Sequence, residues 1–262
     1  MSRAHGGALA LAVGLLAGGP AALAQQTTPS GVRDQPRVAP FEYMGGMQPV
    51  MDNTIFAHAL LEQAEDRWNG RNHEFRYDGQ GWAGGDYNKL WLKSEGTVTN
   101  QGRFEDGQHE VLYDRAVSTF FDVQAGARVD LDSERTRTWA ALGVQGLSLY
   151  FFDVEATIYA SDSGHYAARL KGSYDLLITN HLILQPEAEM NFHTKSDPGR
   201  RTGTGLSDID AGVRLRYELS RKLAPYVGVS YTGLIGQSAT FARREGEDPH
   251  RVSLTFGIRS WF

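Results

Sequence analysis

The sequence predicts an all-β fold, a transmembrane antiparallel up-and-down β-barrel of about twelve strands. Three observations predict it. Segments of about ten residues alternate apolar and polar side chains, as barrel strands do because one face meets lipid and the other meets the lumen. The polar positions carry charges of both signs on strand after strand, and the last strand ends on an aromatic residue, Phe262. A soluble sandwich or lipocalin-like barrel, which also alternates, is the alternative.

Composition excludes several classes of protein. The chain has 262 residues, no cysteine and a formal net charge of −5. The absence of cysteine excludes disulfide scaffolds, thiolate zinc sites, iron–sulfur ligation and cysteine nucleophiles. A mildly acidic balance argues against a nucleic-acid partner, because neutralising phosphates requires clustered Lys and Arg. After the N-terminus, no apolar run approaches the ~20 residues that a membrane helix needs.

Residues 1–24 are predicted to be a secretory signal peptide. Arg3 gives a short polar start, an apolar run extends from Ala8 to Leu16, and Ala22-Leu23-Ala24 forms a small-x-small cleavage site. A buried N-terminal helix is the alternative. Export together with a lack of cysteine fits a protein of the bacterial envelope.

Residues 25–53 are predicted to be a flexible periplasmic linker, because Gln, Thr, Ser and Pro recur and little apolar surface is available for burial. Three of the five methionines, Met44, Met47 and Met51, lie within this linker. Thioether sulfur is a soft ligand suited to Cu(I), and the intervening glycines would let the segment wrap an ion. The second interpretation, a hydrophobic latch that docks on the barrel, remains open because Met also fills gaps in apolar packing.

The barrel is predicted to span residues 54–262. Its strands are expected at 55–67, 72–79, 87–96, 108–115, 119–130, 136–146, 150–161, 165–178, 182–194, 207–218, 224–235 and 251–262. Short connections should alternate with long ones at 97–107, 195–206 and 236–250, which would put both termini in the periplasm. The first strand has an alternative, since its faces are mixed and an amphipathic helix capped by Asp52 or Asn53 would also fit.

Aromatic residues near the strand ends are expected to form two interfacial girdles. These residues are Phe121, Phe152, Tyr166, Tyr174, Phe192, Tyr217 and Tyr231. The final strand places Val252, Leu254 and Phe256 on one face and ends Trp261-Phe262, which resembles the terminal signal of bacterial outer-membrane proteins. The outer membrane is therefore the predicted location.

Four motifs can be compared with known families. They are Met44-Gly45-Gly46-Met47 through Met51 with the following Asp52 to Glu65, Glu110-x-Leu112-Tyr113-x-Arg115-Ala116, Phe121-Asp122-x-Gln124-Ala125-Gly126-x-Arg128, and Gly257-Ile258-Arg259-x-Trp261-Phe262. Together they resemble the copper resistance protein B family. The resemblance implies an outer-membrane barrel that binds copper as cargo, without an organic cofactor, and helps to remove it from the periplasm. The implied partners are copper ions, outer-membrane lipid and a periplasmic copper carrier or oxidase. Family members often carry long Met/His-rich repeats before the barrel, whereas residues 25–53 hold three Met and no His.

Candidate copper ligands then fall into two groups. The first comprises Met44, Met47 and Met51 with His58, which follows them at the start of the barrel. The second comprises Glu187, Glu189 and His193 on one inward face, because carboxylate and imidazole suit Cu(II). Salt bridges from these carboxylates to neighbouring basic side chains are the alternative, the candidates being Arg169, Lys171, Arg214 and Arg216.

No catalytic motif is present: the sequence lacks G-x-S-x-G, H-E-x-x-H, a phosphate loop and a dinucleotide loop. The protein is therefore not predicted to be an enzyme. The predicted function is an outer-membrane copper-binding barrel that sequesters or exports periplasmic copper. The alternatives are an outer-membrane hydrolase acting through Asp162, Ser163 and His165 at the outer rim, and a passive narrow pore.

Overall fold

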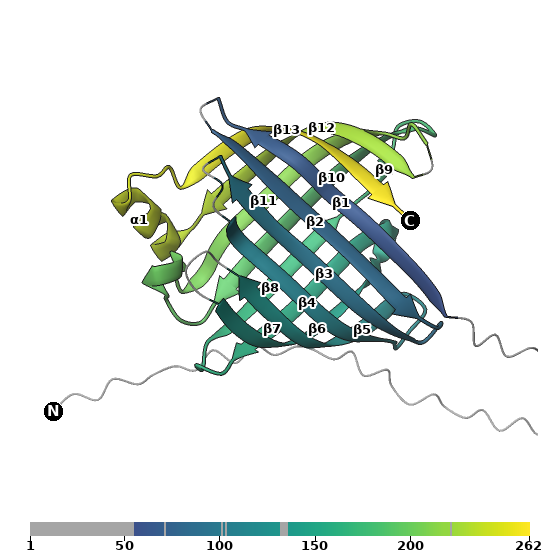
Figure 1. Ribbon diagram of the computed structural model, residues 1–262, viewed down its shortest axis with the longest axis horizontal. Helices are drawn as coiled ribbons and strands as arrows, with labels where there is room; N and C mark the ends of the chain where they lie inside the picture. The colour runs from purple at the N-terminus through teal and green to yellow at the C-terminus, as the bar shows by residue number, and fades with distance from the viewer. Residues whose placement is uncertain (1–54, 71, 101, 103, 132–135, 221) are drawn as a thin grey trace, which may run out of the picture. The chain divides into compact units, whose positions relative to one another are not determined.

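The structure, a computed structural model, describes residues 55–70, 72–100, 102, 104–131, 136–220 and 222–262 (Figure 1). The predicted signal peptide and the predicted linker with Met44, Met47 and Met51 lie outside the described residues. Most of the described chain is β-strand, as the sequence predicts. Among the described residues, no helix is both long and apolar enough to cross a membrane.

The strands form one closed barrel. They are β1 (Phe56–Trp68), β2 (His73–Gly84), β3 (Asn88–Thr99), β4 (Phe104–Ala116), β5 (Phe121–Leu131), β6 (Thr136–Ser148), β7 (Phe152–Ser161), β8 (Tyr166–Ser173), β9 (Leu176–Leu177), β10 (Leu182–His193), β11 (Gly205–Tyr217), β12 (Leu223–Leu234) and β13 (His250–Trp261). Strands β8 and β9 pair one after the other with β10, so they count as one interrupted strand of the wall, and the barrel is twelve-stranded. Pairing of β1 with β13 and of β10 with β11 closes the ring.

The first predicted strand, at 55–67, is indeed a strand, β1, and not an amphipathic helix. β1 pairs with β2 along its whole length and with β13 from Leu60 to Trp68. A β-bulge within the stretch from Leu61 to Ala64 interrupts both ladders. One extra residue reverses the in-and-out alternation, because side chains have a period of two along a strand. This bulge explains why the faces of residues 55–67 are mixed in the sequence.

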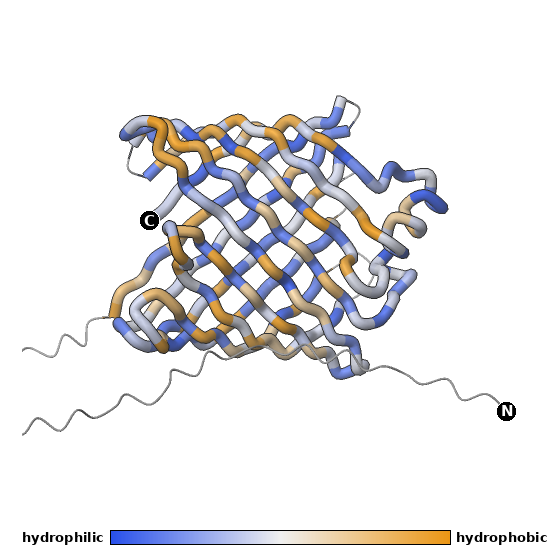
Figure 2. The backbone as a smooth tube through the Cα atoms, turned by 180° about the vertical axis from the view of Figure 1, so that it is seen from behind, coloured by the Kyte–Doolittle hydropathy of each residue, from blue (hydrophilic) through white to orange (hydrophobic). Residues whose placement is uncertain are grey.

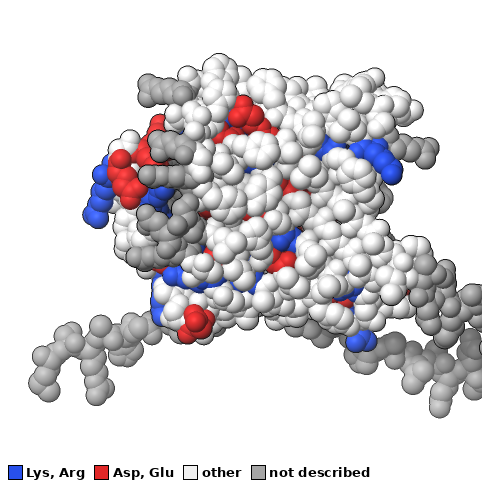
Figure 3. All heavy atoms as spheres, in the orientation of Figure 1, with Lys and Arg blue, Asp and Glu red and all other residues white. Residues whose placement is uncertain are grey.

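The barrel is apolar outside and polar inside. Ile158 and Phe256 are more than half exposed on the outer wall, whereas Glu65 and Asp114 inside are fully buried. The backbone tube alternates apolar and polar residues along each strand, and the visible wall is mostly uncharged (Figures 2 and 3). An apolar outer wall around a polar interior is what a lipid-facing barrel requires, since hydrocarbon contacts the outer wall. Four predicted girdle residues are exposed at or near strand ends, namely Phe152, Tyr166, Tyr217 and Tyr231.

The prediction of a long loop at 97–107 is wrong. At 97–107, β3 continues to Thr99 and β4 begins at Phe104, which leaves a short hairpin connection. Phe104 stacks on Tyr77 and His109, at ring-centroid distances of 6.2 and 6.5 Å, so aromatic contacts extend the sheet where polar residues suggested a loop.

The predicted long connection at 236–250 is present between β12 and β13, and part of it forms the helix α1 (Gly236–Arg244). Its fully buried Ser238 bonds to the Gly203 amide at 2.7 Å and to the Ser207 hydroxyl at 2.9 Å. These two tertiary contacts hold α1 against the start of β11. Sequence periodicity could not predict them.

Candidate functional site

The two ends of the barrel differ. At one of them, which we call the terminal end, β1 begins and β13 ends, and Ala59 and Phe262 exchange backbone hydrogen bonds of 3.0 and 2.8 Å. The terminal end also carries the turns 85–87, 117–120, 149–151, 178–181 and 218–222. The other, which we call the opposite end, carries α1 and the connection 194–204.

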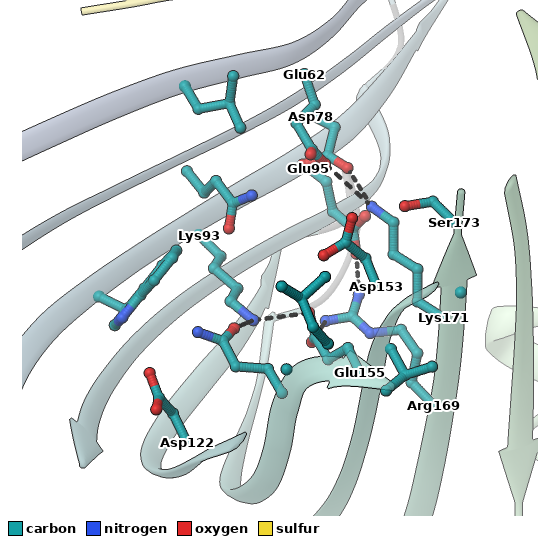
Figure 4. Close-up of a pocket in the computed structure, with 18 of the residues that line it drawn as sticks. Glu62, Asp78, Lys93, Glu95, Asp122, Asp153, Glu155, Arg169, Lys171 and Ser173 are labelled. Atoms are coloured by element: carbon teal, nitrogen blue, oxygen red, sulfur yellow. Dashed lines mark hydrogen bonds and ion pairs between the residues drawn. The ribbon is translucent and has the colours of Figure 1, made fainter. Parts of the chain in front are cut away.

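The barrel interior holds a cavity of about 440 Å³ that reaches toward the terminal end. Thr119 and Phe120, in the turn before β5, line it at that end. Its charged lining comprises the carboxylates Glu62, Asp78, Glu95, Glu110, Asp122, Asp153, Glu155 and Asp175 and the bases Lys93, Arg169, Lys171 and Arg259 (Figure 4). Eight carboxylates against four bases give the cavity a negative potential, which favours cations.

Ion pairs join opposite walls of the lumen at the inner side of this cavity. Lys171 Nζ on β8 lies 2.7 Å from Asp78 Oδ2 on β2, and these two strands lie half-way around the ring from each other. Arg169, also on β8, pairs with Glu95 on β3 and with Glu110 on β4, the latter at 2.8 Å. Figure 4 shows Lys171 and Arg169 extending from one wall toward carboxylates of the other.

A fourth pair completes this group, which we call the cross-lumen cluster. Lys93 Nζ on β3 lies 2.8 Å from Glu155 Oε2 on β7. The cross-lumen cluster therefore consists of Asp78, Lys93, Glu95, Glu110, Glu155, Arg169 and Lys171. Every member comes from a wall strand, so no loop is inserted into the lumen to make these contacts.

A second ion-pair group, the Glu65 cluster, fills the interior beside β1, β11 and β12. Glu65 is fully buried and accepts hydrogen bonds from Arg67, Arg214 and Tyr226. The Glu65–Arg67 distance is 2.7 Å, and the contacts with Arg214 and Tyr226 are both 2.9 Å. Arg67 also binds Asp210 at 2.7 Å. Buried charges that are paired and hydrogen-bonded in this way avoid the large cost of unpaired burial.

The predicted row on β10 faces inward, but its members have different partners. Glu187 accepts a hydrogen bond from Gln63 at 3.0 Å and lies 3.4 Å from Arg214 and 3.7 Å from Lys171. For Glu187, the salt-bridge alternative is therefore the observed one. Two of the four predicted basic partners make these contacts.

Glu189 is buried and accepts a hydrogen bond of 2.9 Å from the Asn191 amide. The same amide donates to Asp208 at 2.9 Å. His193 is partly buried at the end of β10. Within the described part of the chain, no three His, Asp or Glu side chains are gathered closely enough to hold a metal ion. The row Glu187, Glu189 and His193 is thus not a preformed three-ligand site, and its role in copper binding stays a prediction.

His58 lies on the inner side of the barrel wall, near the terminal end. It stands opposite Trp82 in the β1–β2 ladder, with 6.2 Å between ring centroids, and Trp82 stands opposite Trp91 at 6.3 Å. Lys89 and Lys93 lie over these indoles at 5.7 and 5.8 Å. This aromatic row was not predicted. Its signal was present in the sequence, since Trp82 and Trp91 fall on the otherwise polar faces of two adjacent strands.

The rim residues considered for hydrolysis form a turn at the opposite end. Ser163 Oγ lies 3.0 Å from His165 Nδ1, and Asp162 accepts a hydrogen bond from Ser161 at 3.0 Å. Among the described residues, no carboxylate is hydrogen-bonded to His165, so the third member of a catalytic triad is missing there.

Comparison with known proteins decides the family. The family model described as "Copper resistance protein B precursor (CopB)" matches residues 55–262, the whole barrel. The chain belongs to the copper resistance protein B family. It is 43% identical over 231 residues to copper resistance protein B of Escherichia coli, covering 88% of this chain and 77% of that protein. It is also 43% identical over 242 residues to the copper resistance protein B homolog of Pseudomonas syringae pv. tomato, covering 91% and 81%.

Among solved structures, a NanC porin superposes with a TM-score of 0.50 at 14% identity, covering 78% of this chain and 99% of that one. This likeness concerns the fold alone. Membership of the copper resistance protein B family and a closed porin-like barrel together assign the protein to the bacterial outer membrane and to copper resistance. The predicted family, fold class and location are confirmed.

Proposed function

We propose that this barrel binds copper at its terminal end and thereby protects the cell by sequestering it. Copper is the cargo in this proposal. One observation carries it: the acid-rich cavity and His58 both lie at the end where the chain enters β1, a few residues after the three methionines in sequence. In the sequence, a set of soft sulfur ligands thus precedes an imidazole, and the barrel places this imidazole at the same end as a cation-attracting cavity.

The ligand sets would suit different oxidation states. Met44, Met47 and Met51 would capture Cu(I) with His58, because thioether and imidazole are the softer ligands of the chain. Glu189 and His193, which lie toward the opposite end of β10, would bind Cu(II) as a separate set, with Glu187 joining only if it exchanged its ion pairs for the metal.

Topology is part of the proposal. Removal of residues 1–24 and a periplasmic linker at 25–53 would put the terminal end of the barrel in the periplasm. A periplasmic copper carrier or oxidase would then deliver copper to that end. The outer-membrane lipid would contact the apolar wall.

The experiment is a copper titration of the full chain folded in detergent micelles. Replacing Met44, Met47 and Met51 together by Leu should abolish Cu(I) binding under reducing conditions, measured by competition with a Cu(I) chelator. Met190→Leu is the matched control, because Met190 lies on the lipid side of β10 in the alternation. Unchanged Cu(I) affinity in the triple variant would refute the linker site.

A second titration tests the lumen set. Under oxidising conditions, Glu189→Gln and His193→Gln should each change the electron paramagnetic resonance spectrum of bound Cu(II). His250→Gln serves as the control, because His250 is exposed and stacks on the exposed ring of Tyr231. If all three variants give the wild-type spectrum, Cu(II) is held elsewhere.

A further inference from the structure

The lumen-facing side chains in the middle of the barrel are almost completely shielded from water. Glu110 is 2% exposed, Arg169 is 5% and Tyr159 is 2%. In a water-filled pore such inward polar side chains would be wet, since the interior of a conducting barrel is an aqueous channel. Their burial shows that neighbouring side chains occupy the space between the walls.

Two groups fill the cross-section from different sides. On the side of β4 to β7, Tyr159 packs in a buried cluster with Leu112, Trp139 and Ala141, and its hydroxyl donates to Glu110 at 2.8 Å. Arg128 stacks over the Tyr159 ring at 4.5 Å. On the side of β1, β11 and β12, the buried ion pairs of the Glu65 cluster fill the cross-section.

The cross-lumen cluster joins these two halves. Lys171–Asp78 and Arg169–Glu95 connect walls that are opposite or nearly opposite in the ring, so their side chains lie across the path that an ion would take. Gln63 on β1 and Glu187 on β10 add a further contact between distant strands, a hydrogen bond of 3.0 Å. Direct contacts of this length leave no room for a hydrated ion to pass between the partners.

We propose that the cross-lumen cluster is a fixed partition that closes the barrel to ions, so that the cavity at the terminal end is a blind chamber and not the entrance of a conduit. Cations that enter the chamber meet paired charges at its floor. The partition follows from the packing alone, whereas its meaning for copper, retention in place of passage, rests on the proposed function.

Conductance of the full chain in a planar lipid bilayer tests the partition. The wild-type barrel should show no channel steps in KCl solution. The variant Asp78→Ala, Glu95→Ala, Arg169→Ala, Lys171→Ala removes two opposite-charge pairs without changing net charge, and its ion flux should rise at least about tenfold. The matched control, Arg201→Ala with Glu247→Ala, removes an ion pair of 2.8 Å from the loops at the opposite end and should stay closed.

Folding of each variant is checked by its heat-dependent mobility on a gel and by far-ultraviolet circular dichroism. Porin-sized steps in the wild-type protein overturn the proposal, as does a folded quadruple variant that remains closed. If the quadruple variant does not fold, wild-type protein in vesicles that contain a copper-quenched dye decides instead. If external Cu(II) quenches the dye as slowly as in protein-free vesicles that contain the same dye, the partition is supported. Rapid quenching overturns it.

Copper binding is measured separately on the same preparations. Loss of binding in the methionine variant concerns only the proposed function and should leave the barrel closed. A barrel that binds copper and also conducts would refute the partition alone. The two proposals therefore fail by different observations.

Discussion

Lys171 on β8 reaches across the lumen to Asp78 on β2, with 2.7 Å between Nζ and Oδ2. These two strands lie on opposite sides of the barrel. Glu62 and Glu187 approach the same ammonium group at 3.6 and 3.7 Å. One lysine thus ties together side chains from β1, β2 and β10. Removal of a single charge would leave several carboxylates facing one another in a poorly hydrated interior.

Glu65 is expected to be the most costly carboxylate to remove. Glu65→Ala leaves Arg67 and Arg214 buried without their shared partner, and loss of one member of a buried ion pair typically costs about 3–5 kcal/mol. The free energy of unfolding in detergent, measured by denaturant titration, should fall by an amount of that order. Glu247→Ala, which removes an exposed pair, should change it by less than ~1 kcal/mol. Equal effects of the two substitutions would contradict this account of the interior.

Gly126 is expected to be needed at the contact between β4 and β5. A Cβ atom at this position would clash with the carbonyl oxygen of Val111 and lie 2.8 Å from the Leu112 Cα, and backbone atoms cannot move aside without opening the ladder. Gly126→Ala should lower the free energy of unfolding by about 1–3 kcal/mol, as overpacking does. Gly85→Ala is the control, because a Cβ atom at Gly85, in the β2–β3 turn, would have no neighbouring atom within 4 Å. A folded Gly126→Ala barrel with wild-type stability would show that these strands are less tightly packed.

Acid should loosen the connection 194–204 at the opposite end. Burial opposes ionisation of Asp197, but a 2.5 Å hydrogen bond from Arg137 and the charges of Arg137 and Arg200 outweigh it and hold the pKa of Asp197 below its ordinary value. The stabilisation is therefore complete above the ordinary aspartate pKa of ~3.9 and is lost as the pH falls through the lower, folded-state value.

Hydrogen exchange of residues 194–204 as a function of pH measures this loss. Wild-type protein should show a rise in exchange below about pH 4, beyond the intrinsic change of exchange rate with pH. Asp197→Asn should exchange fast at neutral pH and lack the additional transition. A wild-type profile in Asp197→Asn would show that the Arg137 contact does not order this connection.

Copper at His58 should be visible in tryptophan fluorescence. The imidazole lies 6.2 Å from the Trp82 ring, so a copper ion bound to it would quench that indole among the five tryptophans of the chain. Trp82→Phe should bind copper with unchanged affinity and lose most of the quenching. Trp68→Phe, which removes an indole at the opposite end, should retain it. Quenching that persists in Trp82→Phe would place the ion away from His58.

Much of the barrel could be predicted from periodicity because lipid and lumen select opposite side chains at alternate positions. In 152–161, for example, the predicted inward positions Glu155, Thr157 and Tyr159 are the ones that point inward. The prediction failed where tertiary contacts extend or interrupt the pattern. The stacking of Phe104 lengthened β3 and β4, and the buried hydrogen bonds of Ser238 hold a helix where a loop was expected.

The order of residues along the chain was enough to assign the lipid-facing side of most strands, the family, and the kinds of atoms available to copper. It was not enough to say which charges meet, because residues as distant in the chain as Asp78 and Lys171, separated by 93 positions, become neighbours only when the ring closes. The register of the β1–β2 ladder set Trp82 beside His58, and closure of the ring turned alternating acids and bases into a packed interior. The physical reason is that alternation assigns a side chain to a face, whereas the partner on that face depends on strand register and on the width of the closed barrel.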